Sequence, residues 1–126
     1  MSPEEHDPAY LWDMLAAARR VASYVRDATY EQYLSDDMMR DAVERNLITI
    51  GEAARNVSRT FQKAHPKIPF GQIVGLRNIV VHDYGKVDHR RIWAIVTEHI
   101  PHLIDRLPAL IPPPPEEAGR PPPGRG

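Results

Sequence analysis

The residues best suited to chemistry lie in one short stretch, Leu76 to Tyr84, which reads Leu-Arg-Asn-Ile-Val-Val-His-Asp-Tyr. An imidazole such as that of His82 can take or give a proton near neutral pH. A guanidinium such as that of Arg77 can hold a phosphate with two hydrogen bonds and stabilise charge that develops in a transition state. In RNA the 2′-hydroxyl is itself the nucleophile, so the protein need not supply one. The stretch therefore predicts phosphodiester chemistry on RNA without a metal ion.

The spacing of these residues sets a geometric condition. On one continuous helix a stripe would run along one face, and its glycines would leave room for another backbone, a partner helix or a substrate. Its members are Gly71, Gly75, Asn78 and His82. Arg77 and His82 differ by about 140° around such a helix, so they do not share its face. Either the Arg side chain curls round, or the helix loosens near its end, or the working pair comes from two subunits.

A purely structural interpretation of the same residues stays open. His82 would lie near a helix C-terminus, where an imidazole can interact with the helix dipole. Arg77 would be an ordinary surface side chain that packs its stem on apolar neighbours. Physical reasoning from these residues alone does not choose between this interpretation and catalysis.

Two groups of side chains have the residue types of a metal site. Asp37, Asp41 and Glu44 share a helical face and offer the oxygen ligands that Mg²⁺ prefers. A second group, Glu98 with His102 and Asp105, lacks a further ligand. A solvated surface explains both groups more simply, so we predict no metal and no cofactor.

A basic run follows the stretch directly, with Lys86, His89, Arg90 and Arg91. These side chains would suit a rim that binds phosphates. The alternative is an exposed first turn of a helix.

Helical periodicity runs through almost the whole body of the chain, and no alternating strand pattern interrupts it. Asp7 before Pro8 predicts an N-cap, and Thr29 with Gln32 predicts a capping box. Asp88 predicts another cap. We expect an all-α, up-and-down bundle of four to five helices over residues 8–26, 30–34, 37–64, 70–84 and 88–107.

Two residues should disturb these helices. Gly51 in the middle of the long helix should cost about 1 kcal/mol relative to alanine, which suggests that another helix passes close to it. Pro101 lies inside the last helix, where it removes a backbone hydrogen bond and predicts a kink.

Composition limits what the chain can do. It has 126 residues, no cysteine and a net charge of −1, which exclude thiol chemistry and a globally basic nucleic-acid binder. No apolar run approaches the roughly 20 residues of a membrane span, and the acidic start does not look like an export signal, so we expect a cytoplasmic protein. Residues 112–126 hold 7 of the 13 prolines. We therefore predict a helical domain over residues 1–111 and a disordered, proline-rich tail over 112–126.

The chain also resembles a known family. Arg77-x-x-x-x-His82-x-Tyr84 is similar to the signature of the HEPN superfamily, and specifically of its HepT-like toxins. Four further segments are similar to that family and extend the resemblance to about residues 8–110. They are Asn46–Ala53, Pro66–Pro69, Ile92–Trp93 and Ile100–Leu103.

The resemblance implies a HEPN-like bundle, a homodimer whose signature helices face a shared cleft, and a metal-independent RNase. Arg77 and His82 would be catalytic and Asn78 would support them. The resemblance further implies a type VII toxin–antitoxin pair, in which an MntA-like nucleotidyltransferase antitoxin modifies Tyr84 with AMP. The alternative is a non-catalytic HEPN binding module that partners a minimal nucleotidyltransferase. A DNA-binding helical regulator is a third interpretation, which the net charge does not favour.

Overall fold

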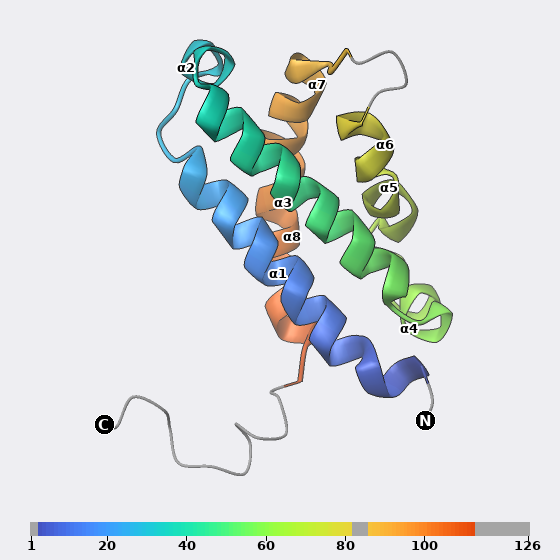
Figure 1. The fold of residues 1–126 in the computed structure, drawn as a ribbon. Helices are drawn as coiled ribbons and strands as arrows, with labels where there is room; N and C mark the ends of the chain where they lie inside the picture. The colour runs from blue at the N-terminus through green and yellow to red at the C-terminus, as the bar shows by residue number, and fades with distance from the viewer. Residues whose placement is uncertain (1–2, 82–85, 113–126) are drawn as a thin grey trace, which may run out of the picture.

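The computed structural model describes residues 3–81 and 86–112, and these are helical almost throughout, without a strand. The all-α prediction is confirmed. The long segments of the chain run alternately up and down the bundle (Figure 1). The helices are α1 (Asp7–Tyr24), α2 (Tyr30–Ser35), α3 (Asp37–Asn56), α4 (Arg59–Ala64), α5 (Phe70–Val74), α6 (Leu76–Val80), α7 (His89–Ala94) and α8 (Ile100–Arg106).

Two long helices, α1 and α3, form the centre of the bundle and make its most extensive contact (Figure 1). Helices α5 and α6 pack against α3, whereas α8 packs against α1. The core is almost entirely aliphatic, and its fully buried side chains include Leu11, Leu15, Leu47 and Ile50. These recur every three or four residues, as an amphipathic helix requires.

The N-terminal cap was predicted wrongly. Asp7 does not cap α1; His6 stands at that position and makes no side-chain cap. Instead the buried carboxylate of Asp7 accepts hydrogen bonds from the backbone N–H and the hydroxyl of Ser58, at 2.7 and 2.6 Å. The other two predicted caps, the box of Thr29 with Gln32 and the cap of Asp88, are confirmed.

The same contact explains why the long helix over 37–64 is two helices. Val57 and Ser58 are extended, and the Ser58 hydroxyl caps α4 by accepting from the N–H of Phe61. A backbone N–H that bonds to Asp7 cannot also continue the helix. The predicted stop before Pro66 is confirmed, because α4 ends at Ala64.

The helix expected over 70–84 is also interrupted. It divides at Gly75 into α5 and α6, and the chain leaves α6 at Val81 in an extended conformation. The predicted close approach at Gly51 is confirmed, since a Cβ there would stand 3.0 Å from the carbonyl oxygen of Ile73.

The last helix is not continuous: a π turn, Ile95–His99, joins α7 to α8, and Pro101 lies in the first turn of α8 and not in the interior of a helix. The backbone N–H of Ile100 donates a hydrogen bond to the carbonyl oxygen of Ile95, five residues back, as in a π-helix. The buried residues around it are Ile92, Val96, Ile100, Leu103, Leu107 and Ile111. They are spaced by 4, 4, 3, 4 and 4 residues, a longer repeat than the 3.6 residues of an α-helix. The extra residue of the π turn keeps them on one face and leaves His99 exposed.

The last described residues close the core. A short 3₁₀ turn, Leu107–Leu110, leads to the buried Ile111. The tail predicted over 112–126 lies outside the described residues except for Pro112. No helix within residues 3–81 and 86–112 combines the length and apolar character of a membrane span.

Candidate functional site

Two of the four predicted site residues, Arg77 and Asn78, stand next to each other on α6, and both are exposed. Arg77 forms no ion pair with any other described residue. His82 and Tyr84 lie outside the described residues, so the structure places two of the four predicted site residues, which are also neighbours in sequence.

Packing against the core fixes α6, the helix that carries Arg77. Leu76 and Val80 are buried against the core, and α6 packs along α3. The close approach at Gly51 includes this helix, because a Cβ at Gly51 would stand 3.7 Å from the backbone nitrogen of Arg77. Val81 is 52% exposed and extended, so a projection onto one ideal helix does not reach residue 82.

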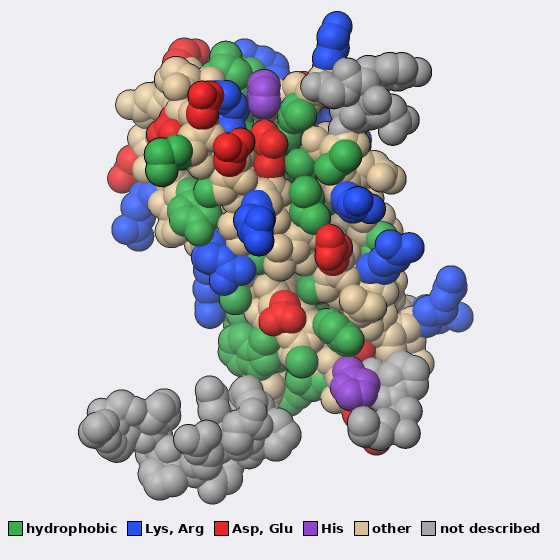
Figure 2. Space-filling view, viewed as in Figure 1, with side chains coloured by type: hydrophobic (Ala, Val, Ile, Leu, Met, Phe, Trp, Pro, Cys, Tyr) green, Lys and Arg blue, Asp and Glu red, His purple; other side chains and the backbone are tan. Residues whose placement is uncertain are grey.

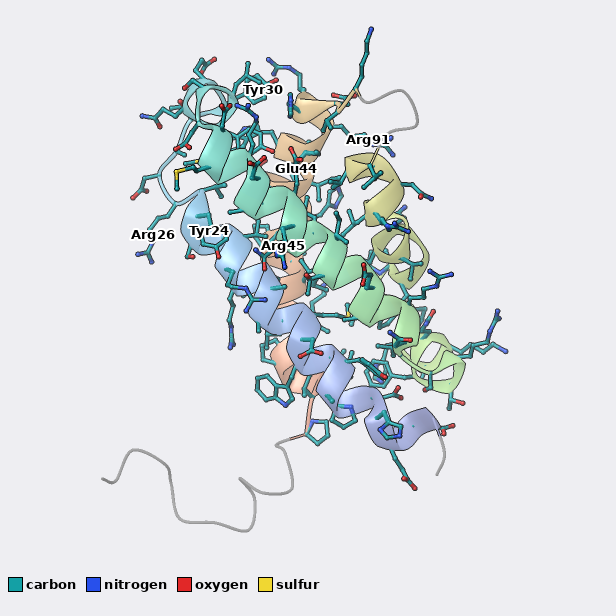
Figure 3. The ribbon with its side chains drawn as sticks, viewed as in Figure 1. Tyr24, Arg26, Tyr30, Glu44, Arg45 and Arg91 are labelled. Carbon is teal, nitrogen blue, oxygen red and sulfur yellow. The ribbon has the colours of Figure 1, made fainter. Side chains whose placement is uncertain are left out.

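A hollow of about 700 Å³ lies beside the end of α6. Val81 and Val87 both line it, so the described chain on either side of residues 82–85 borders α3 here. Figure 3 shows two of the α3 residues that line it, Glu44 and Arg45. The full lining is Asp41, Glu44, Arg45, Ile48, Thr49, Glu52, Val80, Val81 and Val87.

A second, larger groove of about 740 Å³ separates α5 and α6 from α7 and α8. Its floor is aliphatic and includes Ile73, Ile79 and Leu103. Its charged lining residues are all basic, namely Lys67, Arg91 and Arg106. A chain with 17 acidic and 16 basic residues thus has a groove without a single carboxylate among its described lining residues.

The predicted stripe of Gly71, Gly75, Asn78 and His82 is only partly open to solvent in its described residues. Gly71 is exposed and a Cβ there would meet no atom within 4 Å, whereas Gly75 is half-buried and lines the groove. Asn78 is exposed. The face of α1 and α3 has a different character, because acidic and basic side chains alternate on it (Figure 2). A surface of mixed sign gives no attraction for a polyanion.

Two residues for which a surface position was the simpler prediction are partly buried and face each other. Glu44 of α3 and His89 of α7 approach to 4.0 Å between Oε2 and Nδ1, and their side chains are 20% and 30% exposed. Burial raises the pKa of Glu44 above its usual value, and the charge of Asp41 adds to that effect while His89 opposes it. The pair spans 45 positions of the chain, so no local spacing could have indicated it.

The other sites considered from the sequence remain surface features. Glu98, His102 and Asp105 are all exposed. In residues 3–81 and 86–112 no group of three or more His, Asp or Glu side chains is arranged to hold a metal ion. Of the basic run, His89 is half-buried and Arg90 stacks over the ring of Tyr30, 4.2 Å from its centroid.

Comparison with known sequences covers most of the bundle. Residues 14–110 match the family described as "Ribonuclease HepT-like". A protein of Methanocaldococcus jannaschii named as a putative RNase is 38% identical over 95 residues, which are 75% of this chain and 87% of the relative. A protein of Thermococcus cleftensis named "Probable ribonuclease HepT" is 36% identical over 101 residues, 80% of this chain and 92% of the relative. No solved structure gives a significant match.

Proposed function

The chain belongs to the family of HepT-like ribonucleases, and on that premise we propose that it is the toxin of a type VII toxin–antitoxin pair. Its activity would be cleavage of RNA without a metal ion. The observation that carries the proposal is the family match over residues 14–110, which includes the complete Arg77-x-x-x-x-His82-x-Tyr84 signature.

In this proposal the RNA supplies its own nucleophile. The 2′-oxygen attacks the adjacent phosphorus, the bond from phosphorus to the 5′-oxygen breaks, and a 2′,3′-cyclic phosphate is left. Arg77 stabilises the additional negative charge of the five-coordinate phosphorus. His82 takes the proton of the 2′-hydroxyl or returns one to the leaving 5′-oxygen. Asn78 supports the imidazole. The exposure of Arg77 and its lack of an ion pair in the described part of the chain support the assignment, because its guanidinium is free for a phosphate.

We further propose a homodimer in which the α5–α6 faces of two subunits meet. The open space over Gly71 and the apolar groove beside Gly75 support this, since both would admit a second chain. A dimer would also allow Arg77 of one subunit to work with His82 of the other. Light scattering at micromolar concentration should give twice the chain mass. Gly71→Trp fills open space in the protomer, so it should yield a folded monomer; a monomeric wild type would contradict this part of the proposal.

The partner in the proposal is a nucleotidyltransferase antitoxin of the MntA type. It would transfer AMP from ATP to the hydroxyl of Tyr84, releasing pyrophosphate. The attached phosphate would then occupy the place that Arg77 offers to RNA, and cleavage would stop.

The catalytic roles can be tested with three variants of the purified chain. Arg77→Ala and His82→Ala should each abolish RNA cleavage, whereas Arg59→Ala, an exposed arginine of α4, should keep it. Cleavage should persist in EDTA and leave a cyclic phosphate end. Complete loss of activity in EDTA would reject the metal-free mechanism, and full activity of both site variants would reject the site.

The modification is tested by intact mass spectrometry after incubation with the partner and ATP. The wild type should gain one or more AMP masses, and Tyr84→Phe should gain none while still cutting RNA. Equal modification of Tyr84→Phe would exclude Tyr84 as the acceptor. If neither form is modified and neither cuts RNA, the alternative of a non-catalytic binding module replaces the toxin.

A further inference from the structure

The hollow beside α6 links the proposed catalytic segment to α3. The segment that contains His82 and Tyr84 lies between Val81 and Lys86, the nearest described residues on either side of it. Val81 and Val87 line one hollow together with Glu44 and other residues of α3, so the described chain on both sides of this segment borders α3. The two ends are fixed on α3 in different ways.

The first end is fixed by packing. Val80, the residue before the exposed Val81, is buried, and α6 packs along α3. Apolar contacts of this kind hold α6 without help from charged groups.

The second end is fixed differently. Asp88 caps α7 and His89 is its first residue, so their positions determine where the chain enters this helix. Within the described structure, His89 is the residue of this turn that forms an ion pair with α3, through Glu44 at 4.0 Å. Nδ1 of His89 is buried and has no hydrogen-bond partner among the described residues. A buried ring nitrogen without a partner costs free energy unless a neighbouring charge compensates it, and Glu44 is placed to do so.

The surroundings leave Glu44 as the acidic group for this role. On α3, Asp41 is exposed, and Arg40 already contacts Asp37 and the carbonyl of Leu34.

From α2, the ring of Tyr33 meets the edge of the His89 ring, with centroids 6.5 Å apart, and its buried hydroxyl has no hydrogen-bond partner in the described structure. Burial raises the pKa of that hydroxyl, so Tyr33 stays neutral. The guanidinium of Arg90 in α7 stacks on the ring of Tyr30 in α2.

We propose that Glu44 and His89 are positioning residues of the ribonuclease: their contact anchors on α3 the start of α7, the helix that follows the proposed catalytic stretch in the chain. Neither residue touches the reacting atoms in this proposal. The inference rests on the proposed function for its effect on catalysis, whereas the anchoring itself is a property of the fold.

A double-mutant cycle tests the pair. Glu44→Gln and His89→Gln should each lower kcat for RNA cleavage by about two- to tenfold, with KM unchanged, and the double variant should be no worse than either single one. Glu98→Gln, an exposed carboxylate of the π turn, is the control and should match the wild type. Losses that multiply in the double variant would overturn the proposal.

Hydrogen exchange separates this proposal from the proposed function. Amides of residues 86–92 should exchange several times faster in Glu44→Gln and in His89→Gln than in the wild type or in Glu98→Gln. If the wild type does not cut RNA but the exchange changes as described, the anchoring stands and the ribonuclease assignment fails. If the wild type cuts RNA and the exchange is unchanged in both variants, the anchoring is wrong and the assignment stands. If neither result appears, both are wrong.

Discussion

Replacing Gly51 by alanine sets two effects of opposite sign against each other. Gly51 lies in the middle of α3, and alanine is favoured there by helix propensity. In the folded protein, however, the new Cβ would stand 3.0 Å from the carbonyl oxygen of Ile73, 3.5 Å from that of Val74 and 3.7 Å from the nitrogen of Arg77. All three neighbours are backbone atoms, which cannot move aside as the end of a flexible side chain can.

The magnitudes decide the sign. Alanine in place of glycine gains about 1 kcal/mol in a helix interior, and overpacking a tight contact costs about 1–3 kcal/mol. We therefore expect Gly51→Ala to lower the free energy of unfolding by up to about 2 kcal/mol, or about 4–8 °C in Tm for each kcal/mol. To relieve this overly close contact, α5 and α6 must move away from α3 and carry Arg77 with them. We therefore expect kcat to fall by about two- to tenfold.

Gly71→Ala is the matched control for stability. Gly71 lies in α5, where a Cβ would meet no atom within 4 Å, so only the propensity gain of about 1 kcal/mol remains. Thermal unfolding of both variants, at a concentration below that at which light scattering detects a dimer, should give shifts of opposite sign. If Gly51→Ala is stabilised as much as Gly71→Ala and keeps full activity, the backbone of α5 does not press on α3 as described.

Three further predictions concern the rest of the chain. Asp7→Ala removes both hydrogen bonds to the buried Ser58 and should lower the free energy of unfolding in urea by about 2–4 kcal/mol; a loss below about 0.5 kcal/mol would contradict the contact. Burial raises the pKa of Glu44 above 4.5, so the folded chain binds this proton more tightly than the unfolded chain and wild-type stability should fall as pH rises from 4.5 through the folded pKa. Urea titrations at several pH values should show a smaller fall of the free energy of unfolding with pH for Glu44→Gln than for the wild type. An equal fall in both proteins would refute Glu44 as its cause. Deleting residues 112–126 should leave Tm and RNA cleavage nearly unchanged, because a proline-rich segment without apolar anchors buries little; a loss of several degrees would show that it docks.

Features that depend on neighbours in sequence could be predicted without the structure. The capping box of Thr29 and Gln32 and the cap of Asp88 each join residues three apart, and both were found as expected. The aliphatic repeats of α1 and α3 likewise predicted the two central helices. In these places local propensity and tertiary packing favour the same conformation.

Features that depend on distant residues could not be predicted in this way. The break between α3 and α4 needs Asp7, 51 positions before Ser58, and nothing near Ser58 distinguishes it from a helical serine. The same holds for Glu44 and His89, which each fit a solvated surface when considered alone. At the candidate site the structure shows that Arg77 and Asn78 are exposed, whereas their proposed roles stay predictions. The sequence did not predict that α6 ends at Val80, because helical periodicity continues to Tyr84.

The π turn at Ile95–His99 holds one residue more than a regular α turn needs. Removing one residue there would let the turn close as an ordinary α turn, and Leu103, Leu107 and Ile111 would keep facing the core. Removing one residue from the α-helical turns beyond it would instead rotate everything that follows by about 100°. Evolution can therefore shorten this helix by one residue at the π turn but hardly elsewhere. Functional relatives that lack one residue in this helix should have their gap between Ile95 and His99.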